Sequence, residues 1–481
     1  MGFVGFSQKQ DRIWCFGSNA GIDFNDTLNP IPFTSVLPQN AQDSYASIAD
    51  SNGNLLFYAA GVRWDTLGAR IYNRNFQMMQ NGDSIRGQPN RAQPLIIIPF
   101  PGDNNKYYLF SWSYSYYSSV HYSIIDMRQD GGLGAVVQKN IFLLQDTICE
   151  KMKAVKHANG RDWWILLRRY YDNIYYKFLV TPSGVSGPYT QGIGTLTDVY
   201  YGQMVFTQNG DKLAFVASTG CIDLMDFDRC TGMLSNYIDV GEHGAWTPST
   251  SYYGCAFSGN GTKLYTTTET TLTDLKYIFQ YDLTAANIRA SKQTVWSYPD
   301  TLNFWLGEMQ LAPDGKIYVA KGDAYNSYAN TIYDQNIDYI TFPDSLGSAC
   351  GYCSNCFSLQ GYGLGELGLP NMPNYNLGAL IGSPCDTITT SAGNPLSTFH
   401  SQLSTYPNPA SSNSQITFTY PSLSSPSEII INNIDGKEVA RYSLPLWSNI
   451  QHLKLPRLAA CIYVARLLSN GFSANTKFAV Y

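Results

Sequence analysis

The chain has 481 residues and a net charge of −5, and charged residues make up only 14% of it. It has no basic patch and no run of about 18 apolar residues, which argues against nucleic-acid binding and against a transmembrane helix. Tyr (36), Gly (41) and Pro (23) are abundant, a composition typical of short strands joined by turns rather than of helices.

The N-terminus and the cysteine content favour an exported protein. Ten cysteines are many for a cytosolic protein of this length, and they indicate an oxidising, extracytoplasmic compartment. Residues 1–8, MGFVGFSQ, are similar to the tail of a signal peptide without its basic region and full apolar core. We expect them to be the remnant of such a signal.

A unit of two apolar strands joined by a tight turn recurs between residues 40 and 350. Most of its turns are Asn-Gly or Asp-Gly, which supply the positive φ angles that tight hairpins require. The turn glycines lie 49 to 58 residues apart, at Gly53, Gly102, Gly160, Gly210, Gly261 and Gly315. A period of about 50 residues, with hairpins and no helical pattern, predicts a β-propeller.

The repeat also predicts how each unit continues and how the ring closes. A third strand ends in an aspartate that opens the next turn, at Asp126, Asp228, Asp282 and Asp338. The flanks, around residues 13–16 and 355–385, are expected to pair in one more blade, because joining the first and last strands leaves no free edge. Seven blades is the prediction, with six and eight as alternatives.

The predicted domain order is a propeller at residues 9–385, a Ser/Thr-rich linker at 386–403 and a second domain at 404–481. The second domain has alternating strands such as residues 415–420 and 462–467, with turns such as Asn470–Gly471 between them. Turns at intervals of roughly 8–12 residues predict a small β-sandwich. The whole chain is therefore predicted to be all-β.

This last segment resembles the type A C-terminal sorting domain of type IX secretion substrates. The resemblance rests on Tyr406–Ala410, the turn at residues 434–437, the run at residues 458–464 and Lys477. It implies a domain that guides the protein across the outer membrane and is then removed, while the mature part is tethered to the cell surface or released. The implied sorting residues are Tyr406, Pro407, Asn408, Pro409, Gly436, Ile462, Tyr463 and Lys477. The family usually has glycine where Cys461 stands, and glycine would tolerate a positive φ there.

The large domain resembles a group of exported Bacteroidetes proteins with predicted propeller repeats and no known activity. The segments that carry this resemblance are residues 14–24, 53–57, 226–232 and 368–375. Together, the two resemblances imply a protein secreted or held on the outer cell surface, with the type IX secretion machinery as a partner. They imply no chemistry, because propellers host many unrelated functions.

Six cysteines are candidates for disulfides: Cys230, Cys255, Cys350, Cys353, Cys356 and Cys385. The cluster from Cys350 to Cys356, together with Cys385, is expected to staple the last blade and the linker. A metal site and free thiols are the alternatives, although no further cysteine follows at the ferredoxin interval. Cys230 and Cys255 are a second candidate pair, since neighbouring blades could bring them together. No metal and no cofactor is predicted.

Aromatic stretches suggest carbohydrate binding, because exposed rings offer flat apolar faces with polar tips. The candidate ligand-binding residues are Trp112, Tyr114, Tyr116, Tyr170 and Tyr175. The alternative is that these rings pack between blades. The acids are scattered singly along the chain, so no carboxylate pair for glycoside cleavage can be recognised. His157 is interpreted as a polar turn residue.

The leading functional prediction is a secreted or surface-displayed binding module for a glycan or a protein. One alternative is a polysaccharide hydrolase or lyase at the propeller channel. It would need two acids, or an acid with His157 or His243, at the channel mouth. Another alternative is a structural component of a surface layer or matrix. The lack of a catalytic motif favours binding over catalysis.

Overall fold

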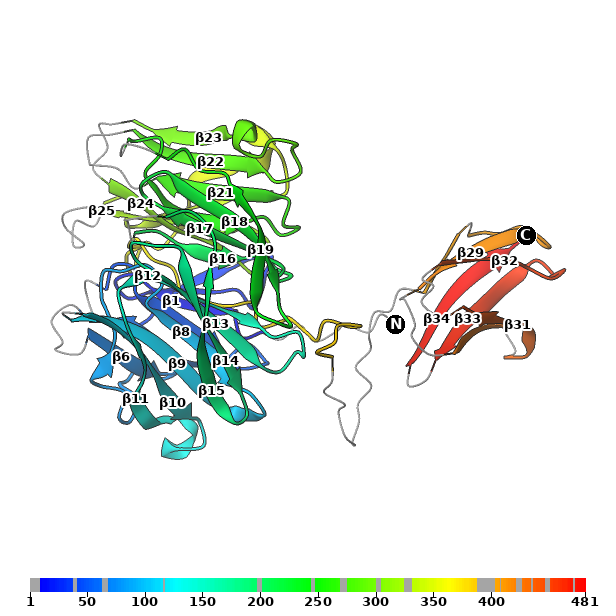
Figure 1. Ribbon diagram of the computed structural model, residues 1–481, viewed down its shortest axis with the longest axis horizontal. Helices are drawn as coiled ribbons and strands as arrows, with labels where there is room; N and C mark the ends of the chain where they lie inside the picture. Colours follow the sequence, from blue (N-terminus) through cyan, green and yellow to red (C-terminus); the bar gives the residue numbers. More distant parts are fainter. Residues whose placement is uncertain are drawn as a thin grey trace. The chain divides into compact units, whose positions relative to one another are not determined.

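In the computed structural model, the chain divides into a large unit, Phe6–Ile388, and a small C-terminal unit, Thr389–Tyr481 (Figure 1). The structure describes residues 9–37, 41–62, 68–115, 117–196, 201–243, 247–268, 275–299, 304–323, 331–386, 403–406, 408–420, 426–433, 436–445, 450–469 and 472–481.

The described residues of the large unit form seven antiparallel sheets, each built from strands that are consecutive in the chain. The first sheet has three strands: β1 (Ile13–Phe16), β2 (Ala20–Asp23) and β3 (Ile31–Thr34). Six four-stranded sheets follow. The first three of these are β4 (Tyr45–Ala49), β5 (Leu55–Gly61), β6 (Gly68–Asn73) and β7 (Ile85–Arg86); β8 (Leu95–Phe100), β9 (Asp103–Ser115), β10 (Tyr117–Asp126) and β11 (Ala135–Gln145); and β12 (Ile148–Lys156), β13 (Trp163–Arg169), β14 (Ile174–Thr181) and β15 (Gly184–Gly192).

The remaining three sheets repeat this arrangement. They are β16 (Met204–Phe206), β17 (Lys212–Ala217), β18 (Cys221–Asp228) and β19 (Met233–Asp239); β20 (Tyr252–Phe257), β21 (Lys263–Thr268), β22 (Lys276–Asp282) and β23 (Gln293–Tyr298); and β24 (Phe304–Leu311), β25 (Ile317–Asp323), β26 (Asn336–Ile340) and β27 (Tyr352–Ser358). The described helices are short 3-10 turns: η1 (Asp130–Gly132), η2 (Arg289–Ser291) and η3 (Gly347–Cys350).

Burial identifies the first strand of each four-stranded sheet as the innermost. β4 and β20 are buried at every residue, whereas the fourth strands β15 and β19 are mostly exposed. The first strands also contact one another in chain order, from β1 to β4 and on to β24. Sheets arranged radially around a central axis in this way make the large unit a β-propeller, which confirms the predicted fold.

The six predicted turn glycines all lie between the first and second strands of a sheet, and all have positive φ, from 69° to 90°. Three of the four predicted aspartates end a third strand: Asp126, Asp228 and Asp282. The fourth prediction is wrong. Asp338 lies in the middle of β26 and is fully buried, because it pairs with the buried Lys321 ammonium.

Contrary to the prediction, the two flanks do not share a sheet among the described residues; their backbone pairing is limited to isolated bridges of Ser18 and Asn19 with Leu364. Residues 13–34 supply all three strands of the first sheet, and residues 352–358 complete the last sheet as β27. The two sheets meet through side chains instead: the Trp14 and Phe24 rings lie 5.7 and 5.4 Å from the Tyr318 ring. Seven blades remains a prediction, since the first sheet has three strands in the described chain.

The chain after β27 runs along the propeller axis; residues 364–377 are called the axial segment here. It starts where Leu364 exchanges backbone hydrogen bonds with Ser18. It then bonds to the inner strands of different sheets: Leu367 O accepts from Glu308 N of β24 (2.8 Å), and Asn371 N donates to Tyr45 O of β4 (2.8 Å). The Asn371 amide also donates to the carbonyls of Leu95 in β8 and Met152 in β12 (both 2.9 Å). Only a segment inside the ring can reach all four strands.

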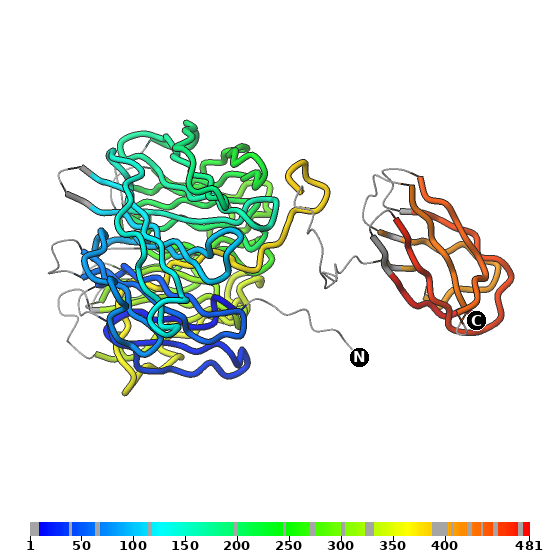
Figure 2. The backbone as a smooth tube through the Cα atoms, turned by 90° about the horizontal axis from the view of Figure 1, so that it is seen from below, coloured from blue at the N-terminus to red at the C-terminus, as the bar shows by residue number. Residues whose placement is uncertain are grey.

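The axial segment has a direction, because Gly368 and Asn371 bond near the start of β4, to Gln42 and Tyr45, and its later residues bond near the end of β12. Tyr375 O accepts from Lys156, the last residue of β12 (2.8 Å), and Leu380 N donates to Ala158 O beyond that strand (2.7 Å). A disulfide then joins Cys385 to Cys230. Figures 1 and 2 show the yellow chain crossing the propeller between the sheets. We call the end where the inner strands begin the channel mouth and the other end the channel exit.

The small unit is a β-sandwich, as predicted. One sheet holds β28 (Ser404–Tyr406), β29 (Gln415–Thr419) and β32 (Ile450–Lys454). The other holds β31 (Glu438–Leu444), β30 (Ser427–Asn432), β33 (Cys461–Ser469) and β34 (Phe472–Val480). Alternate residues of both sheets, among them Phe418, Ile431 and Phe478, form one buried core.

Candidate functional site

Four carboxyl groups are buried at the channel mouth. Asp43 lies two residues before the inner strand β4. Glu150 lies in β12, Glu308 in β24 and Glu366 in the axial segment. Their exposed fractions are 5%, 1%, 1% and 5%. Arg91, which precedes β8, lies 3.8 Å from Glu150. Buried ionisable groups that converge from different elements are typical of functional sites.

Each carboxyl group has a defined contact. Asp43 accepts a hydrogen bond from the Tyr253 hydroxyl. Glu308 Oε2 accepts from Leu369 N of the axial segment (2.9 Å), and Glu150 Oε1 accepts from Gly202 N (3.1 Å). Glu366 accepts from Ser18 Oγ (2.6 Å) and Tyr45 OH (2.7 Å). The cluster therefore anchors the axial segment as well as lining the mouth.

Burial controls the protonation of this cluster. It raises the pKa of Asp43 to about 7, with the Tyr253 hydrogen bond and Arg91 lowering that pKa and the charge of Glu366 raising it. Burial also raises the pKa of Glu308 well above its usual value, and the neighbouring Asp43 charge adds to that increase. Burial thus favours the protonated form of Glu308, which can donate a hydrogen bond, while a pKa of about 7 leaves Asp43 close to half ionised at neutral pH.

Three buried polar atoms near the mouth have no hydrogen-bond partner among the described residues: Asp43 Oδ1, Glu308 Oε1 and Trp305 Nε1. Buried polar groups in native proteins are nearly always satisfied, and leaving one unsatisfied costs about 1–3 kcal/mol. The mouth therefore combines carboxyl groups with an indole N–H that no described residue of the chain hydrogen-bonds.

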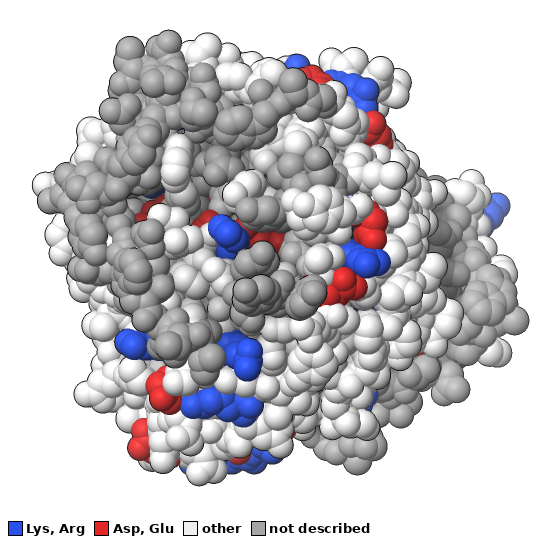
Figure 3. All heavy atoms as spheres, turned by 60° about the vertical axis from the view of Figure 1, so that its left-hand side comes forward, with Lys and Arg blue, Asp and Glu red and all other residues white. Residues whose placement is uncertain are grey.

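Aromatic and apolar side chains lie on the same face, where the second and third strands connect. Tyr171, in the turn between β13 and β14, is 66% exposed, and its ring centroid lies 3.7 Å from that of Tyr170. Leu196 is 72% exposed. Figure 3 shows this face, with acidic and basic atoms in a hollow at its centre.

Of the predicted ligand-binding rings, Tyr170 alone is described at this surface. Trp112 of β9 and Tyr175 of β14 are buried, with exposed fractions of 3% and 0%. The prediction that these two rings face a ligand is wrong, because both pack in the propeller core. The Tyr114 side chain and Tyr116 lie outside the described residues.

The structure contains two disulfides within its described residues, Cys230–Cys385 and Cys353–Cys356. The predicted Cys230–Cys255 pair is wrong. Cys255 is a buried thiol inside β20, whereas Cys230 lies in the turn after β18, at the channel exit. Cys350 is likewise a buried thiol rather than a disulfide. In the described part of the chain, no group of three or more His, Cys, Asp or Glu could hold a metal ion.

Neither candidate histidine contacts the mouth carboxyls among the described interactions. His157 lies in the turn after β12, where its Nε2 is 2.9 Å from Cys230 O and its Nδ1 accepts from Asn159 N (3.1 Å). This supports its interpretation as a turn residue. His243 lies beside Asp239 (2.7 Å) at the end of the outer strand β19.

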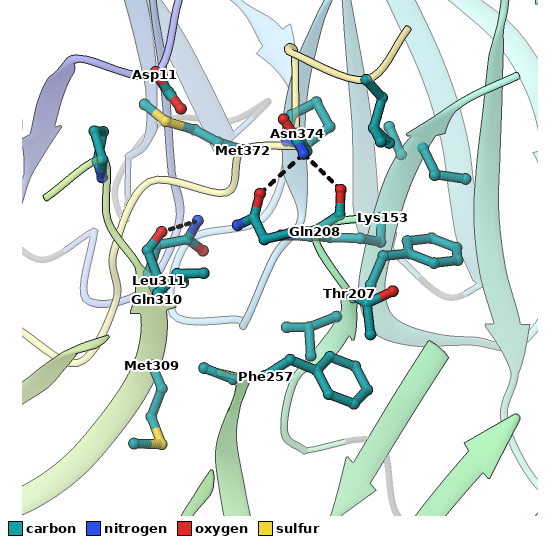
Figure 4. Close-up of a pocket in the computed structure, with 18 of the residues that line it drawn as sticks. Asp11, Lys153, Thr207, Gln208, Phe257, Met309, Gln310, Leu311, Met372 and Asn374 are labelled. Carbon is teal, nitrogen blue, oxygen red and sulfur yellow. Dashed lines mark hydrogen bonds between the residues drawn. The ribbon is translucent and has the colours of Figure 1, made fainter. Parts of the chain in front are cut away.

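A separate cavity of about 70 Å³ lies at the channel exit, beside the axial segment (Figure 4). Its polar lining includes Lys153, Gln208, Gln310 and Asn374. Its apolar lining comes from Phe257, Met309, Leu311 and Met372.

The sequence analysis missed the mouth carboxyls because they are far apart in the chain. A signal for them exists: Asp43 and Glu150 each lie ten residues before a turn glycine, and Glu308 lies seven before one. Residues at such offsets fall at the start of an inner strand, which a propeller always brings to the axis.

The predicted sorting residues of the small unit fall into two groups. Asn408 and Tyr463 hold the sandwich together: Asn408 Oδ1 accepts from Ala479 N (2.9 Å), and the buried Tyr463 donates to Ala459 O (3.0 Å). Ile462 and Lys477 are exposed on neighbouring strands. Pro409 follows Asn408 and is exposed, and Gly436 has a φ of 81°. Pro407 and the Tyr406 side chain lie outside the described residues.

Cys461, the residue that departs from the family pattern, is the first residue of β33 and pairs with Val480. It is not among the residues with positive φ. A glycine is therefore not required at this position.

Residues 404–481 match the family described as the secretion system C-terminal sorting domain. The small unit is a sorting domain of this family. Such a type IX sorting domain indicates secretion and attachment to the cell surface, so the secretion machinery is a partner of this chain. None of the described helices is long and apolar enough to cross a membrane.

No curated protein matches the chain. Among solved structures, it is similar to the periplasmic gluconolactonase of Pseudomonas aeruginosa (13% identity, 74% of this chain and 96% of that chain, TM-score 0.44). It is also similar to a quinonprotein alcohol dehydrogenase-like protein from Bacteroides thetaiotaomicron (12% identity, 72% and 75%, TM-score 0.37). A third is the β-propeller domain of Cps50 from Myceliophteria thermophila (10% identity, 66% and 94%, TM-score 0.36). Similarities this distant say nothing about the chemistry of this chain.

Proposed function

We propose that the propeller is a surface-displayed binding module that holds a glycan at the channel mouth. The observation that carries this proposal is the set of three buried, unpartnered polar atoms there: Asp43 Oδ1, Glu308 Oε1 and Trp305 Nε1. Sugar hydroxyls both donate and accept hydrogen bonds, so one ligand can satisfy carboxyl oxygens and an indole N–H together.

The axial segment limits how such a ligand binds. It occupies the channel between β4, β8, β12 and β24, so a chain of sugars cannot pass through the ring. The ligand is therefore an end of a glycan, or a branch, placed over the mouth. The exposed Tyr171 ring beside Tyr170 offers an apolar face to sugars further from the axis.

A second candidate function is glycan cleavage at the same mouth. It is favoured by Asp43 and Glu308, two carboxyl groups whose pKa values are raised by burial. Glycosidases use one such protonated carboxyl as a general acid beside a second carboxylate. This candidate has the same ligand class and differs in whether product is released.

The domain plan and the sorting residues belong to this proposal. Residues 9–385 are the displayed propeller, 386–403 the linker and 404–481 the sorting domain. The exposed Ile462 and Lys477 are available to the secretion machinery, whereas Asn408 and Tyr463 support the fold. Ile462→Ser and Lys477→Ala should reduce secretion without lowering the melting temperature of the sorting domain, and an unchanged secreted fraction would contradict this division.

The test of function is a glycan array probed with the full chain, produced in an oxidising compartment, with both retention and released sugar measured. Retention that Trp305→Phe weakens supports the binding module, because this change removes the indole N–H and keeps a ring. Trp296→Phe, on the outer strand β23, is the matched control. Released sugar that Glu308→Gln abolishes supports cleavage instead. Retention that is equal in all variants would place the ligand elsewhere.

A further inference from the structure

The cavity at the channel exit contains a buried cation. Lys153 of β12 is 4% exposed and lines the cavity. Its ammonium group donates to Asn371 Oδ1 (2.9 Å), a neutral acceptor. A buried ammonium normally has a charged partner or several acceptors, because burying it otherwise costs a great deal of free energy.

Glu308, the acidic residue that acts on the pKa of Lys153, does not supply a charged hydrogen-bond partner. Burial lowers the pKa of Lys153 to about 8, and the coulombic effect of Glu308 opposes this shift. Burial raises the pKa of Glu308 well above its usual value, which favours its neutral form. With a pKa of about 8, Lys153 remains mostly charged at pH 7, and it gives the cavity a positive side.

Two amide side chains add hydrogen-bond donors to the same cavity. Asn374 donates to Gln208 Oε1 (2.9 Å) and to Gln208 O (2.7 Å), which fixes the orientation of the Gln208 amide. With its oxygen engaged by Asn374, Gln208 has its Nε2 available as a donor. Figure 4 shows the Gln208 and Gln310 amides extending toward each other across the cavity, with Asp11 on the side away from Lys153.

The size and the apolar wall restrict the ligand further. A water occupies about 15 Å³ of such a volume, so the 70 Å³ cavity has room for about five atoms of that size. The side chains of Met309, Met372 and Phe257, together called the methionine wall here, line the cavity with apolar surface. Gln208 is exposed, so the cavity reaches solvent at the channel exit.

From this arrangement, we propose that the exit cavity binds a short-chain carboxylate, with its carboxylate on Lys153 and Gln208 and its two or three aliphatic carbons on the methionine wall. The site goes beyond the glycan proposal, because the cavity lies toward the exit, although the Lys153 ammonium also senses the charge of Glu308 at the mouth. The carboxylate supplies the negative charge that Lys153 lacks, and the tail removes apolar surface from water.

The experiment is calorimetric titration of the full chain with propionate, and with propionamide as the neutral compound of the same shape. Propionate should bind, and propionamide should bind at least about tenfold more weakly, because it carries no charge for Lys153. Lys153→Gln should weaken propionate binding by about the same factor. Lys139→Gln, which removes a partly exposed lysine on β11, is the control and should leave binding unchanged.

A second variant covers the case in which Lys153→Gln does not fold. Gln208→Ala alters an exposed side chain and should weaken propionate binding while the melting temperature stays unchanged. Equal affinity for propionate and propionamide would overturn the proposal. So would propionate binding that neither variant changes, or no propionate binding at all.

Discussion

The two ends of the propeller channel are built from the same strands but carry different chemistry. Glu308 at the mouth and Gln310 at the exit cavity are only two residues apart on β24. On β12, Glu150 likewise lies at the mouth and Lys153 lines the exit cavity. The mouth gathers several carboxyl groups with raised pKa values, such as Asp43 and Glu308, whereas the exit cavity gathers a lysine and amides with a single such carboxyl group, Asp11. The axial segment lies between them, so one ring presents two separate sites.

The largest expected effect comes from the disulfide that fixes the axial segment at the exit. Cys230→Ser with Cys385→Ser opens a loop with a sequence separation of 155, and chain entropy predicts a loss of roughly 3–5 kcal/mol in the free energy of unfolding. Cys353→Ser with Cys356→Ser, separated by 3, should cost about 2 kcal/mol or less. Urea unfolding of both double variants measures the difference, and equal losses would show that the axial segment does not depend on its anchor.

The next effect concerns the close passage of the axial segment at the mouth. A Cβ on Gly368 would lie 2.2 Å from Asp43 Cα, so Gly368→Ala forces backbone to move. We expect a loss of about 3 kcal/mol in unfolding free energy, as for other overpacked sites. Gly378→Ala is the control, because nothing lies within 4 Å of its Cβ position. A harmless Gly368→Ala would mean that the segment is not tightly held between the sheets.

A third effect is the pH dependence of stability that Asp43 at the mouth should cause. The pKa of Asp43 rises from 3.8 to about 7 on folding, so the native state binds the proton more tightly than the unfolded state does. This contribution to stability is fully present below about pH 4 and is lost as the pH rises toward 7, with a slope of at most ~1.4 kcal/mol per pH unit. Asp43→Asn should flatten the decline in melting temperature over this range. Asp83→Asn, whose pKa is lowered by Lys139, should not.

The smallest effect is at the rim of the mouth. Tyr171→Ala removes a ring that is 66% exposed, so the melting temperature should hardly change. Retention on the glycan that the wild type binds should fall by about 1 kcal/mol, the usual contribution of one stacked ring. Surface retention measured at several glycan densities gives this value. A full loss of retention would move the main site from the centre of the mouth to its rim.

The sequence predicted those parts of the fold that local chemistry determines. Asn-Gly and Asp-Gly turns require positive φ, and every predicted turn glycine has it, from Gly53 to Gly315. The sandwich and the sorting domain were likewise predictable from local patterns: alternating strands with regular turns, and short motifs such as residues 406–410. Ring closure failed because nothing local shows that residues 13–34 form three strands by themselves.

The axial segment and the mouth were not predictable in the same way. Residues 364–377 have no strand or helix pattern. Several of their hydrogen-bond partners lie more than a hundred residues away in the sequence: Ser18, Leu95, Met152 and Gln208. Asp43 and Glu308 become a pair only when the ring forms. The prediction for Trp112 and Tyr175 failed because a sequence does not show whether an aromatic side chain is buried or exposed.

The Cys230–Cys385 bond also determines how the propeller bears a mechanical load. The sorting domain indicates attachment to the cell surface, and the linker that leads to it follows directly after Cys385. A pull transmitted along this linker, for example from fluid drag on a cell, reaches the covalent bond before it reaches any hydrogen bond of the axial segment. The force therefore passes into the turn after β18, and the segment that fills the channel stays unstretched. A propeller tethered in this way can bear tension on its linker while the axial segment stays in the channel.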